Sequence, residues 1–374
     1  MLEQLFGVPF TLVSFVLVLT VVVFVHEFGH FYVARKNGVR CDSFSIGFGP
    51  ELFGYTDSHG TRWKFSLIPL GGYVKMFGEG ETMQVIEGGK EETVSRELTP
   101  EEQKVSFKHK TIGQRAAIVF AGPAVNFLFA ILVFWVMFMT MGRPVTEPVV
   151  GQVVDGSAAA EAGLMTQDRI RSIDGKPMAR FEDIRSATQL SDGSPMELVI
   201  ERDGHEQTLS VTPHLSTGED PFGNATKVYM MGIGPSGETT RAPILNPLEA
   251  LGASVGQTYD IVDGTFIAIG QMIRGKRGTE GMGGPIQIAK YSGLMAKTGF
   301  VEFIAFVAIL SINLGLINLF PVPMLDGGHL LFYAIEAVRG RPLSERAQEW
   351  GLRVGLALVG ALMIFVTWND IVHL

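Results

Sequence analysis

Two histidines and a glutamate stand at a spacing that can do hydrolytic chemistry, in the run His26-Glu27-Phe28-Gly29-His30. On a helix, residues four positions apart lie on the same face, so both imidazoles can reach one metal ion. The glutamate can then take a proton from a water molecule at that metal, as in a zinc protease. A helix end whose polar residues only meet the membrane surface, without a metal, is the alternative, and it accounts less well for the spacing.

A hydrolytic zinc ion needs a third protein ligand and an open position for water. Asp326 is the best candidate, because it is an acidic residue in an apolar stretch bounded by Pro321, Pro323 and Gly327-Gly328. A broken helix at membrane depth is tolerated where it lines a cavity. Alternatively, Asp326 could cap a helix, since Asp before Gly is common in turns. His329 could replace Asp326 as the ligand or support the ligands.

Asn126 is a lone amide in an apolar run that follows Gly122-Pro123. Either it hydrogen-bonds to a neighbouring helix, or it donates to the carbonyl group of a reacting substrate. The sequence favours neither interpretation. The other histidines lie in polar or terminal contexts and are expected at the surface: His59, His109, His205, His214 and His373.

The elements that must position these residues are membrane helices. The chain is 47% apolar and only 18% charged, against about 25% charged in average proteins. Apolar segments at 10–33, 118–141, 303–320 and 354–368 are candidate spans. The net charge of −8 gives no reason to expect nucleic-acid binding, and the single Cys41 excludes an intramolecular disulfide.

Basic residues near the ends of the spans predict the orientation of the chain. They cluster at 35–40, 104–115 and 339–353. All of these clusters lie on the cytoplasmic side if both termini face the other side. The HExxH motif and Asp326 then lie at the same side of the membrane and can meet.

The predicted fold is a mainly α-helical membrane protein with four transmembrane helices, a small cytoplasmic membrane-associated β-element and one external α+β domain. An apolar β-prone stretch at 63–77 is expected to form a hairpin turning at Gly71-Gly72 and to dip into the membrane. Residues 79–104 are expected to form a mobile surface loop. The expected order is a first transmembrane helix at 1–34, a cytoplasmic segment at 35–112, a second transmembrane helix at 113–142, an external domain at 143–215, a linker with short juxtamembrane helices at 216–298, a third transmembrane helix at 299–330, and a cytoplasmic loop with the fourth transmembrane helix at 331–374.

These motifs together resemble the site-2 protease family of M50-type intramembrane zinc metalloproteases, in particular the bacterial regulator of sigma-E protease type. The external domain resembles a bacterial PDZ domain. The resemblance covers nearly the whole chain and rests on residues 26–30, 122–126 and 313–329, with further matches at 47–50, 69–76 and 283–286.

The resemblance implies that zinc is held by His26, His30 and Asp326, with Glu27 activating the water. It further implies a β-loop at 63–77 that pairs with unwound substrate, and a wider set of substrate-binding residues. That set comprises Asn126, Asn313, Asn318, Pro321, Pro323, Gly71, Gly72 and Tyr73.

The family's substrates are single-pass transmembrane proteins, typically anti-sigma factors first cut by a periplasmic protease, and also remnant signal peptides. The implied location is the bacterial inner membrane, with both termini periplasmic and the active site near the cytoplasmic face. The best-known members carry two tandem PDZ domains, whereas this chain has one, so its filter against untrimmed substrates is expected to differ.

Two other classes of protein fit the sequence less well. An ion transporter could use intramembrane His, Glu and Asp, but the sequence has no inverted repeat and no matched pair of broken helices. A catalytically idle scaffold is disfavoured because every residue that the hydrolysis requires is present.

Overall fold

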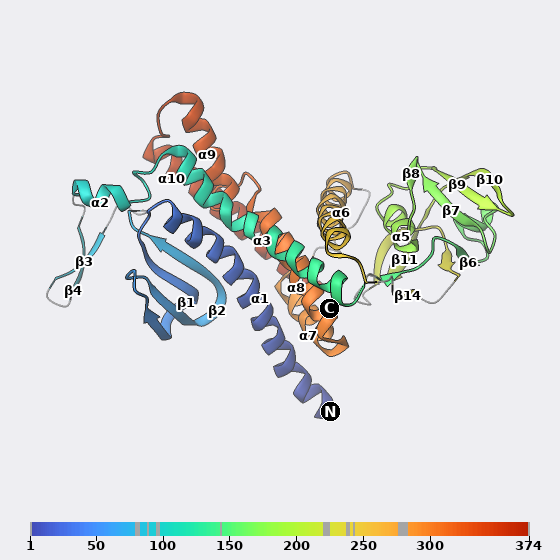
Figure 1. The fold of residues 1–374 in the computed structure, drawn as a ribbon, viewed down its shortest axis with the longest axis horizontal. Coiled ribbons are helices and arrows are strands. Elements are labelled where there is room, and N and C mark those ends of the chain that lie inside the picture. The colour runs from blue at the N-terminus through green and yellow to red at the C-terminus, as the bar shows by residue number, and fades with distance from the viewer. Residues whose placement is uncertain are drawn as a thin grey trace. The chain divides into compact units, whose positions relative to one another are not determined.

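Figure 1 shows the computed structural model, which describes residues 2–372 except 79–82, 88–89, 95–97, 143, 220–224, 237–239, 242–243 and 276–282. The chain forms two compact units. The first unit holds Met1–Val133 and Pro285–Thr367, and the second holds Phe134–Gly284 and Trp368–Leu374. His373, which we expected at the surface, lies outside the described residues.

Long apolar helices dominate the first unit. Its helices are α1 (Leu2–Lys36), α2 (Pro100–Val105), α3 (Ile112–Thr140), α7 (Pro285–Thr298), α8 (Phe300–Asn318), α9 (Asp326–Arg339) and α10 (Glu345–Val372), with α3 and α10 continuing into the second unit. Four of them (α1, α3, α8 and α10) are long and apolar enough to cross a membrane. The prediction of four membrane-spanning helices is therefore confirmed by length and composition.

Glycines let three of these helices approach one another closely. A methyl group at Gly29 of α1 would lie 2.9 Å from the carbonyl carbon of Ala121 in α3. A methyl group at Gly315 of α8 would lie 3.0 Å from the carbonyl oxygen of Pro123, again in α3. Such close backbone contact is typical of small residues between membrane helices, and it brings α1 and α8 against the same part of α3.

The chain breaks between α8 and α9. Pro321 and Pro323 cannot donate the backbone hydrogen bonds that would continue the helix, and Met324 has a positive φ of 88°. The far side of this break packs on α10, since a methyl group at Gly355 would lie 2.6 Å from the carbonyl carbon of Pro323. Helix α9 then begins at Asp326.

Two long strands, β1 (Cys41–Thr56) and β2 (Arg62–Met76), pair beside α1 (Figure 1). Residues 43–46 of β1 lie opposite both ends of β2, at 62–65 and at 72–75. The predicted hairpin turn at Gly71-Gly72 is wrong, because β2 runs through both glycines. Gly71 has a φ of 110°, which distorts the strand without reversing it.

A buried aromatic core joins this pair of strands to the helices. Phe44 of β1 stacks on Trp63 of β2 with ring centroids 4.4 Å apart, and Phe31 of α1 packs on both rings. Ile118 of α3 belongs to the same core. The described part of 79–104, expected as a mobile surface loop, contains a short hairpin of β3 (Met83–Glu87) and β4 (Lys90–Val94) followed by α2.

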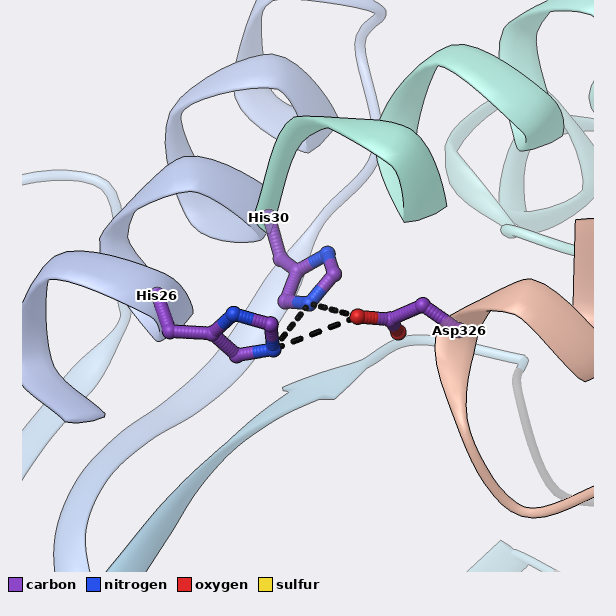
Figure 2. Close-up of side chains that lie close together, drawn as sticks. All are labelled: His26, His30 and Asp326. Atoms are coloured by element: carbon purple, nitrogen blue, oxygen red, sulfur yellow. Dashed lines mark hydrogen bonds and ion pairs between the residues drawn. The ribbon is translucent and has the colours of Figure 1, made fainter. Parts of the chain in front are cut away.

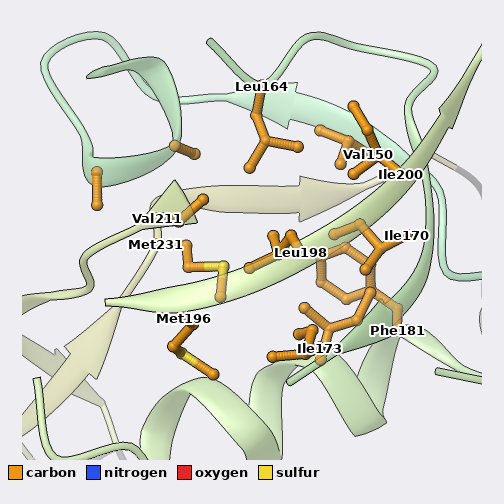
Figure 3. Close-up of a cluster of buried hydrophobic side chains, with 13 residues drawn as sticks. Val150, Leu164, Ile170, Ile173, Phe181, Met196, Leu198, Ile200, Val211 and Met231 are labelled. Atoms are coloured by element: carbon orange, nitrogen blue, oxygen red, sulfur yellow. The ribbon is translucent and has the colours of Figure 1, made fainter. Parts of the chain in front are cut away.

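The second unit contains an α+β fold close to the predicted pattern of strands and helices. Its core is formed by apolar side chains of the strands and the short helices, including Val150, Ile170, Phe181, Leu198 and Met231 (Figure 3). One sheet has the order β10-β9-β7-β8. The elements are β5 (Pro144–Val145), β6 (Val150–Val153), α4 (Ala158–Glu161), β7 (Arg169–Ile173), β8 (Lys176–Pro177), α5 (Phe181–Gln189), β9 (Met196–Arg202) and β10 (His205–Val211).

Residues 216–298 differ from the expected linker with short helices. The strands β11 (His214–Glu219) and β12 (Ala225–Met230) form a hairpin, and β13 (Ile233–Pro235) pairs with β6, while β14 (Thr240–Arg241) pairs with β5. The expected pair of short helices is one continuous α6 (Pro247–Ile273), which begins with a capping box formed by Asn246 and Glu249 and contains no internal proline.

Candidate metal centre

Side chains of His26, His30 and Asp326 point at one another from α1 and the start of α9 (Figure 2). The Nε2 atoms of the two histidines are 3.2 Å apart. Oδ2 of Asp326 lies 3.2 Å from Nε2 of His26 and 3.4 Å from Nε2 of His30. Both histidines are buried, and the Asp326 side chain is 17% exposed. His329 is not part of this group.

Two of the three facing atoms, Nε2 of His30 and Oδ2 of Asp326, are hydrogen-bond acceptors. Nδ1 of His30 lies 2.9 Å from the carbonyl oxygen of Ile118, so Nδ1 carries the proton and Nε2 of the neutral ring presents a lone pair. Oδ2 of Asp326 is buried and accepts no hydrogen bond from any described residue. Acceptors that converge in this way favour a cation between them, and the three side chains could hold a metal ion.

The spacing fits zinc. Zinc binds His nitrogen and carboxylate oxygen at about 2.0–2.2 Å, and a tetrahedron with such bonds has edges of roughly 3.3–3.6 Å. The three observed separations are 3.2, 3.2 and 3.4 Å, close to those edges. Asp326 does not act as a helix cap in this arrangement: it follows the N-cap residue Leu325, and its carboxylate faces the histidines.

Two amides lie beside His26. Nδ2 of Asn126 is 3.3 Å from Nδ1 of His26, on the edge of the ring opposite the three ligand atoms. Nδ2 of Asn318, the last residue of α8, is 3.5 Å from Nε2 of His26. Asn318 therefore lies next to the candidate metal position, and Asn126 lies on the side of the His26 ring that faces away from it.

A cavity of about 920 Å³ opens from this centre, and Glu27 lines it together with the three candidate ligands. Gly72 of β2 packs against α1, since a methyl group there would lie 3.3 Å from Cγ of Glu27 and 2.9 Å from Cγ1 of Val23. The backbone of Val74 hydrogen-bonds to Glu27. Strand β2 is therefore held directly against the carboxylate that could act as a base.

The predicted substrate-binding residues divide into two groups. Gly71, Gly72, Tyr73 and Asn318 line the cavity. Asn313 is half-buried, Pro321 is exposed and Pro323 contacts α10; none of these three, nor Asn126, is among the lining residues.

The cavity also has a charged wall that sequence reasoning missed. Arg115 of α3 and Glu336 of α9 form an ion pair of 2.7 Å, and the guanidinium carbon lies 4.8 Å from the centre of the Tyr333 ring. His329 lines the same wall, and burial lowers the pKa of its imidazole against the opposing effect of Asp326. Residues 329, 333 and 336 are spaced by four and three positions, which places them on one face of a helix. This spacing could have indicated that they line the cavity together.

Asp57 ties the turn between β1 and β2 to the end of α1. Its carboxylate accepts hydrogen bonds from Nη2 of Arg35 at 2.6 Å and from Nε1 of Trp63 at 3.0 Å. It also accepts from the backbone N–H groups of His59 and Thr61 at 2.9 and 3.0 Å. Burial alone raises the pKa of Asp57, but these hydrogen bonds outweigh it and lower the pKa to about 2.

Comparison with known proteins gives consistent matches over most of the chain. Residues 14–362 match the model of peptidase family M50. A protein of Rhizobium meliloti named as a zinc metalloprotease is 45% identical over 367 residues, which covers 98% of this chain and 97% of that protein. One of Agrobacterium fabrum with the same type of name is 44% identical over 362 residues, covering 96% of this chain and 95% of that protein.

A more distant relative is the regulator of sigma-E protease RseP of Salmonella typhimurium. It is 32% identical over 459 aligned residues, which cover 97% of this chain and 99% of that protein. Since the alignment is longer than this chain of 374 residues, the Salmonella protein carries residues that this chain lacks.

Proposed function

Because this chain belongs to peptidase family M50 and is a zinc-dependent metalloendopeptidase, we propose that it hydrolyses peptide bonds within or near transmembrane segments of single-pass membrane proteins. The observation that carries the proposal is the triangle of His26, His30 and Asp326 at the ends of apolar helices, open to a cavity that also holds Glu27. Membership of a peptidase family argues against an ion transporter and against an idle scaffold.

We assign His26, His30 and Asp326 as the zinc ligands. A zinc ion held by them supplies Lewis-acid polarisation to the scissile carbonyl and to the attacking water. Glu27, one residue from His26 and facing the same cavity, takes the proton from the attacking water and later gives it to the leaving amine. Asn318 donates a hydrogen bond from Nδ2 to the oxygen of the substrate carbonyl, since its amide lies beside the candidate metal position.

Substrate is held as an added strand. A transmembrane helix hides its peptide carbonyls in its own hydrogen bonds, so it must unwind before hydrolysis. Residues 72–74 of β2 pair on one side with 44–46 of β1, and no other described strand pairs with them. An extended substrate segment laid along this edge regains the backbone hydrogen bonds that it loses on unwinding, and Glu27 lies beside the same edge.

We propose a bacterial inner-membrane location with both termini periplasmic and the metal centre near the cytoplasmic face. The basic clusters at 35–40, 104–115 and 339–353 support this orientation. Anti-sigma factors already cut by a periplasmic protease are proposed as substrates, because one relative is named as a regulator of sigma-E protease. The test is a reporter enzyme that works only in the cytoplasm, fused to the C-terminus. Activity of this fusion would refute the proposed topology.

The α+β fold at 144–236 is proposed to be a periplasmic PDZ domain that hinders substrates with large external parts. The order of its strands and helices and its single core support this proposal. Since β13 pairs with β6, the deletion that tests it must remove 144–236 and not only 143–215. Cleavage of an untrimmed substrate should then rise, and an unchanged preference for trimmed substrate would refute the filter.

The decisive experiment uses the purified full-length chain and a model single-pass substrate, with and without a zinc chelator. We expect the wild type to cut the substrate within or near its membrane segment and the chelator to stop the cleavage. Glu27→Gln should bind zinc as the wild type does and form no product. Wild-type turnover by Glu27→Gln would show that another group is the base.

A further inference from the structure

Asn126 lies at the crossing of three helices and has an unusual environment for an amide. It is fully buried in α3, and a methyl group at Gly315 of α8 would lie 3.2 Å from its Cβ. Its backbone carbonyl accepts a hydrogen bond from Oγ of Ser311 in α8 at 3.1 Å. Its side chain points to His26 in α1. The amide is therefore held firmly in one place, away from the cavity.

The orientation of this amide conflicts with a ligand role for His26. If Nε2 of His26 faces the metal as a lone pair, the neutral ring carries its proton on Nδ1. Nδ1 then faces Nδ2 of Asn126 at 3.3 Å, and two N–H donors cannot bond to each other. At the same time, the buried Oδ1 of Asn126 has no hydrogen-bond partner among the described residues.

Rotating the amide by half a turn resolves the conflict. The oxygen and nitrogen of an amide have nearly the same shape, and which is which follows from the hydrogen bonds. In the rotated amide, Oδ1 takes the place of Nδ2 and accepts the proton of Nδ1. His30 already has the equivalent arrangement, because its Nδ1 donates to the carbonyl oxygen of Ile118. Helix α3 then supplies the acceptor behind both histidines.

We propose that Asn126 is a positioning residue of the metal centre: Oδ1 accepts a hydrogen bond from Nδ1 of His26 and holds Nε2 in the metal-binding tautomer and direction. The proposal rests on the zinc ligands assigned above. It replaces the two interpretations that the sequence left open, a purely interhelical bond and a donor to the substrate. Ser311 and Gly315 of α8 contact the backbone and Cβ of Asn126 rather than its side-chain amide.

Partners that orient a metal-binding histidine in this way are worth about 10–100-fold in metal affinity. Asn126→Leu keeps the approximate size and removes the acceptor, so zinc affinity should fall by that factor. Asn126→Asp keeps an acceptor at the same place and should bind zinc as the wild type does. Ser311→Ala leaves the amide intact and should also retain the wild-type affinity, which makes it the matched control for helix packing.

The experiment is a zinc titration of the metal-free full-length chain in detergent against a chromophoric chelator, with the thermal stability of each metal-free variant as a check on folding. Wild-type affinity in Asn126→Leu overturns the proposal, and a low kcat in the same variant would then place Asn126 on the substrate. An equal loss in Ser311→Ala also overturns it. Asn126→Ala also removes the acceptor and is measured as a second variant. The conclusion then does not depend on whether Asn126→Leu folds.

One further variant separates this proposal from the assignment on which it rests. His26→Ala should lose far more affinity than Asn126→Leu, because it removes the ligand itself. If His26→Ala binds zinc as tightly as the wild type, the ligand assignment fails. If His26→Ala loses zinc and Asn126→Leu does not, only the role of Asn126 fails.

Discussion

Gly122 touches both histidines of the candidate metal centre, which makes Gly122→Ala a precise perturbation of it. A methyl group at this position would lie 2.5 Å from Cε1 of His30 and 2.9 Å from Cε1 of His26, and closer still to Nε2 of His30. The substitution adds one carbon atom, and alanine is the residue that α-helices favour most. Any loss of function must therefore come from the contact with the imidazoles.

The size of the effect follows from these distances. Carbon atoms in ordinary contact are about 3.5 Å or more apart, so the His30 ring must retreat by about 1 Å. Its other edge is fixed by the hydrogen bond to the Ile118 carbonyl, of 2.9 Å. Ligand distances tolerate only about 0.2 Å, and a misplacement of 1 Å costs about 100-fold in rate. We expect cleavage to fall by about 100-fold and zinc affinity to fall with it.

The assay pairs a zinc titration with cleavage of the model substrate at saturating zinc. The matched control is Gly113→Ala in the same helix, where a methyl group would meet nothing within 4 Å. Gly113→Ala should retain wild-type zinc affinity and turnover. If Gly122→Ala behaves like Gly113→Ala, the two imidazoles are not held against α3 and the ligand geometry is wrong.

Three other substitutions test neighbouring parts of the site. Asp326→Asn should lower the zinc content of the purified protein, and unchanged stoichiometry would exclude Asp326 as a ligand. Gly72→Ala places a methyl group 2.7 Å from the carbonyl oxygen of Ser45 and 2.9 Å from Cγ1 of Val23, so it should displace β2 and reduce cleavage while zinc affinity stays at the wild-type level; equal loss of both would argue against a substrate role for this strand. The pKa of Asp57 is lowered to about 2 by its hydrogen-bond donors, so its contribution to stability is complete above about pH 4, the range of an unfolded Asp, and is lost as the pH falls towards 2. The difference in Tm between wild type and Asp57→Asn should shrink over that window, and a constant difference would show that the lowered pKa is not linked to folding.

Local features of the chain allowed much of this structure to be predicted. Three of the four apolar runs are long enough to specify membrane-spanning helices by themselves, whereas the fourth, at 354–368, is short and its helix extends over Arg346–Val372. The spacing of His26 and His30 specifies a shared helix face. Asp326 stood out because a carboxylate in an apolar stretch is costly unless it has a partner. These signals need no knowledge of which segments meet in space.

The errors arose where distant segments decide the structure. Gly71-Gly72 is typical of a turn, yet β1 pairs along β2 and keeps the chain extended through both glycines. Residues 233–235 looked like part of a linker, but they complete the fold by pairing with β6, some eighty residues earlier. The acceptor behind His30 is the backbone carbonyl of Ile118, and a carbonyl leaves no signal in a sequence.

Helix α10 contacts the break between α8 and α9, where Gly355 packs against Pro323, so its role is not limited to spanning the membrane. The two histidines belong to one continuous helix, but the carboxylate follows a proline-rich break whose far side leans on α10. A chain truncated before α10 would retain both imidazoles, but it would lose the helix that packs behind the break and supports the position of Asp326. The last helix thus supports the candidate metal centre, although none of its described residues belongs to the group of His26, His30 and Asp326.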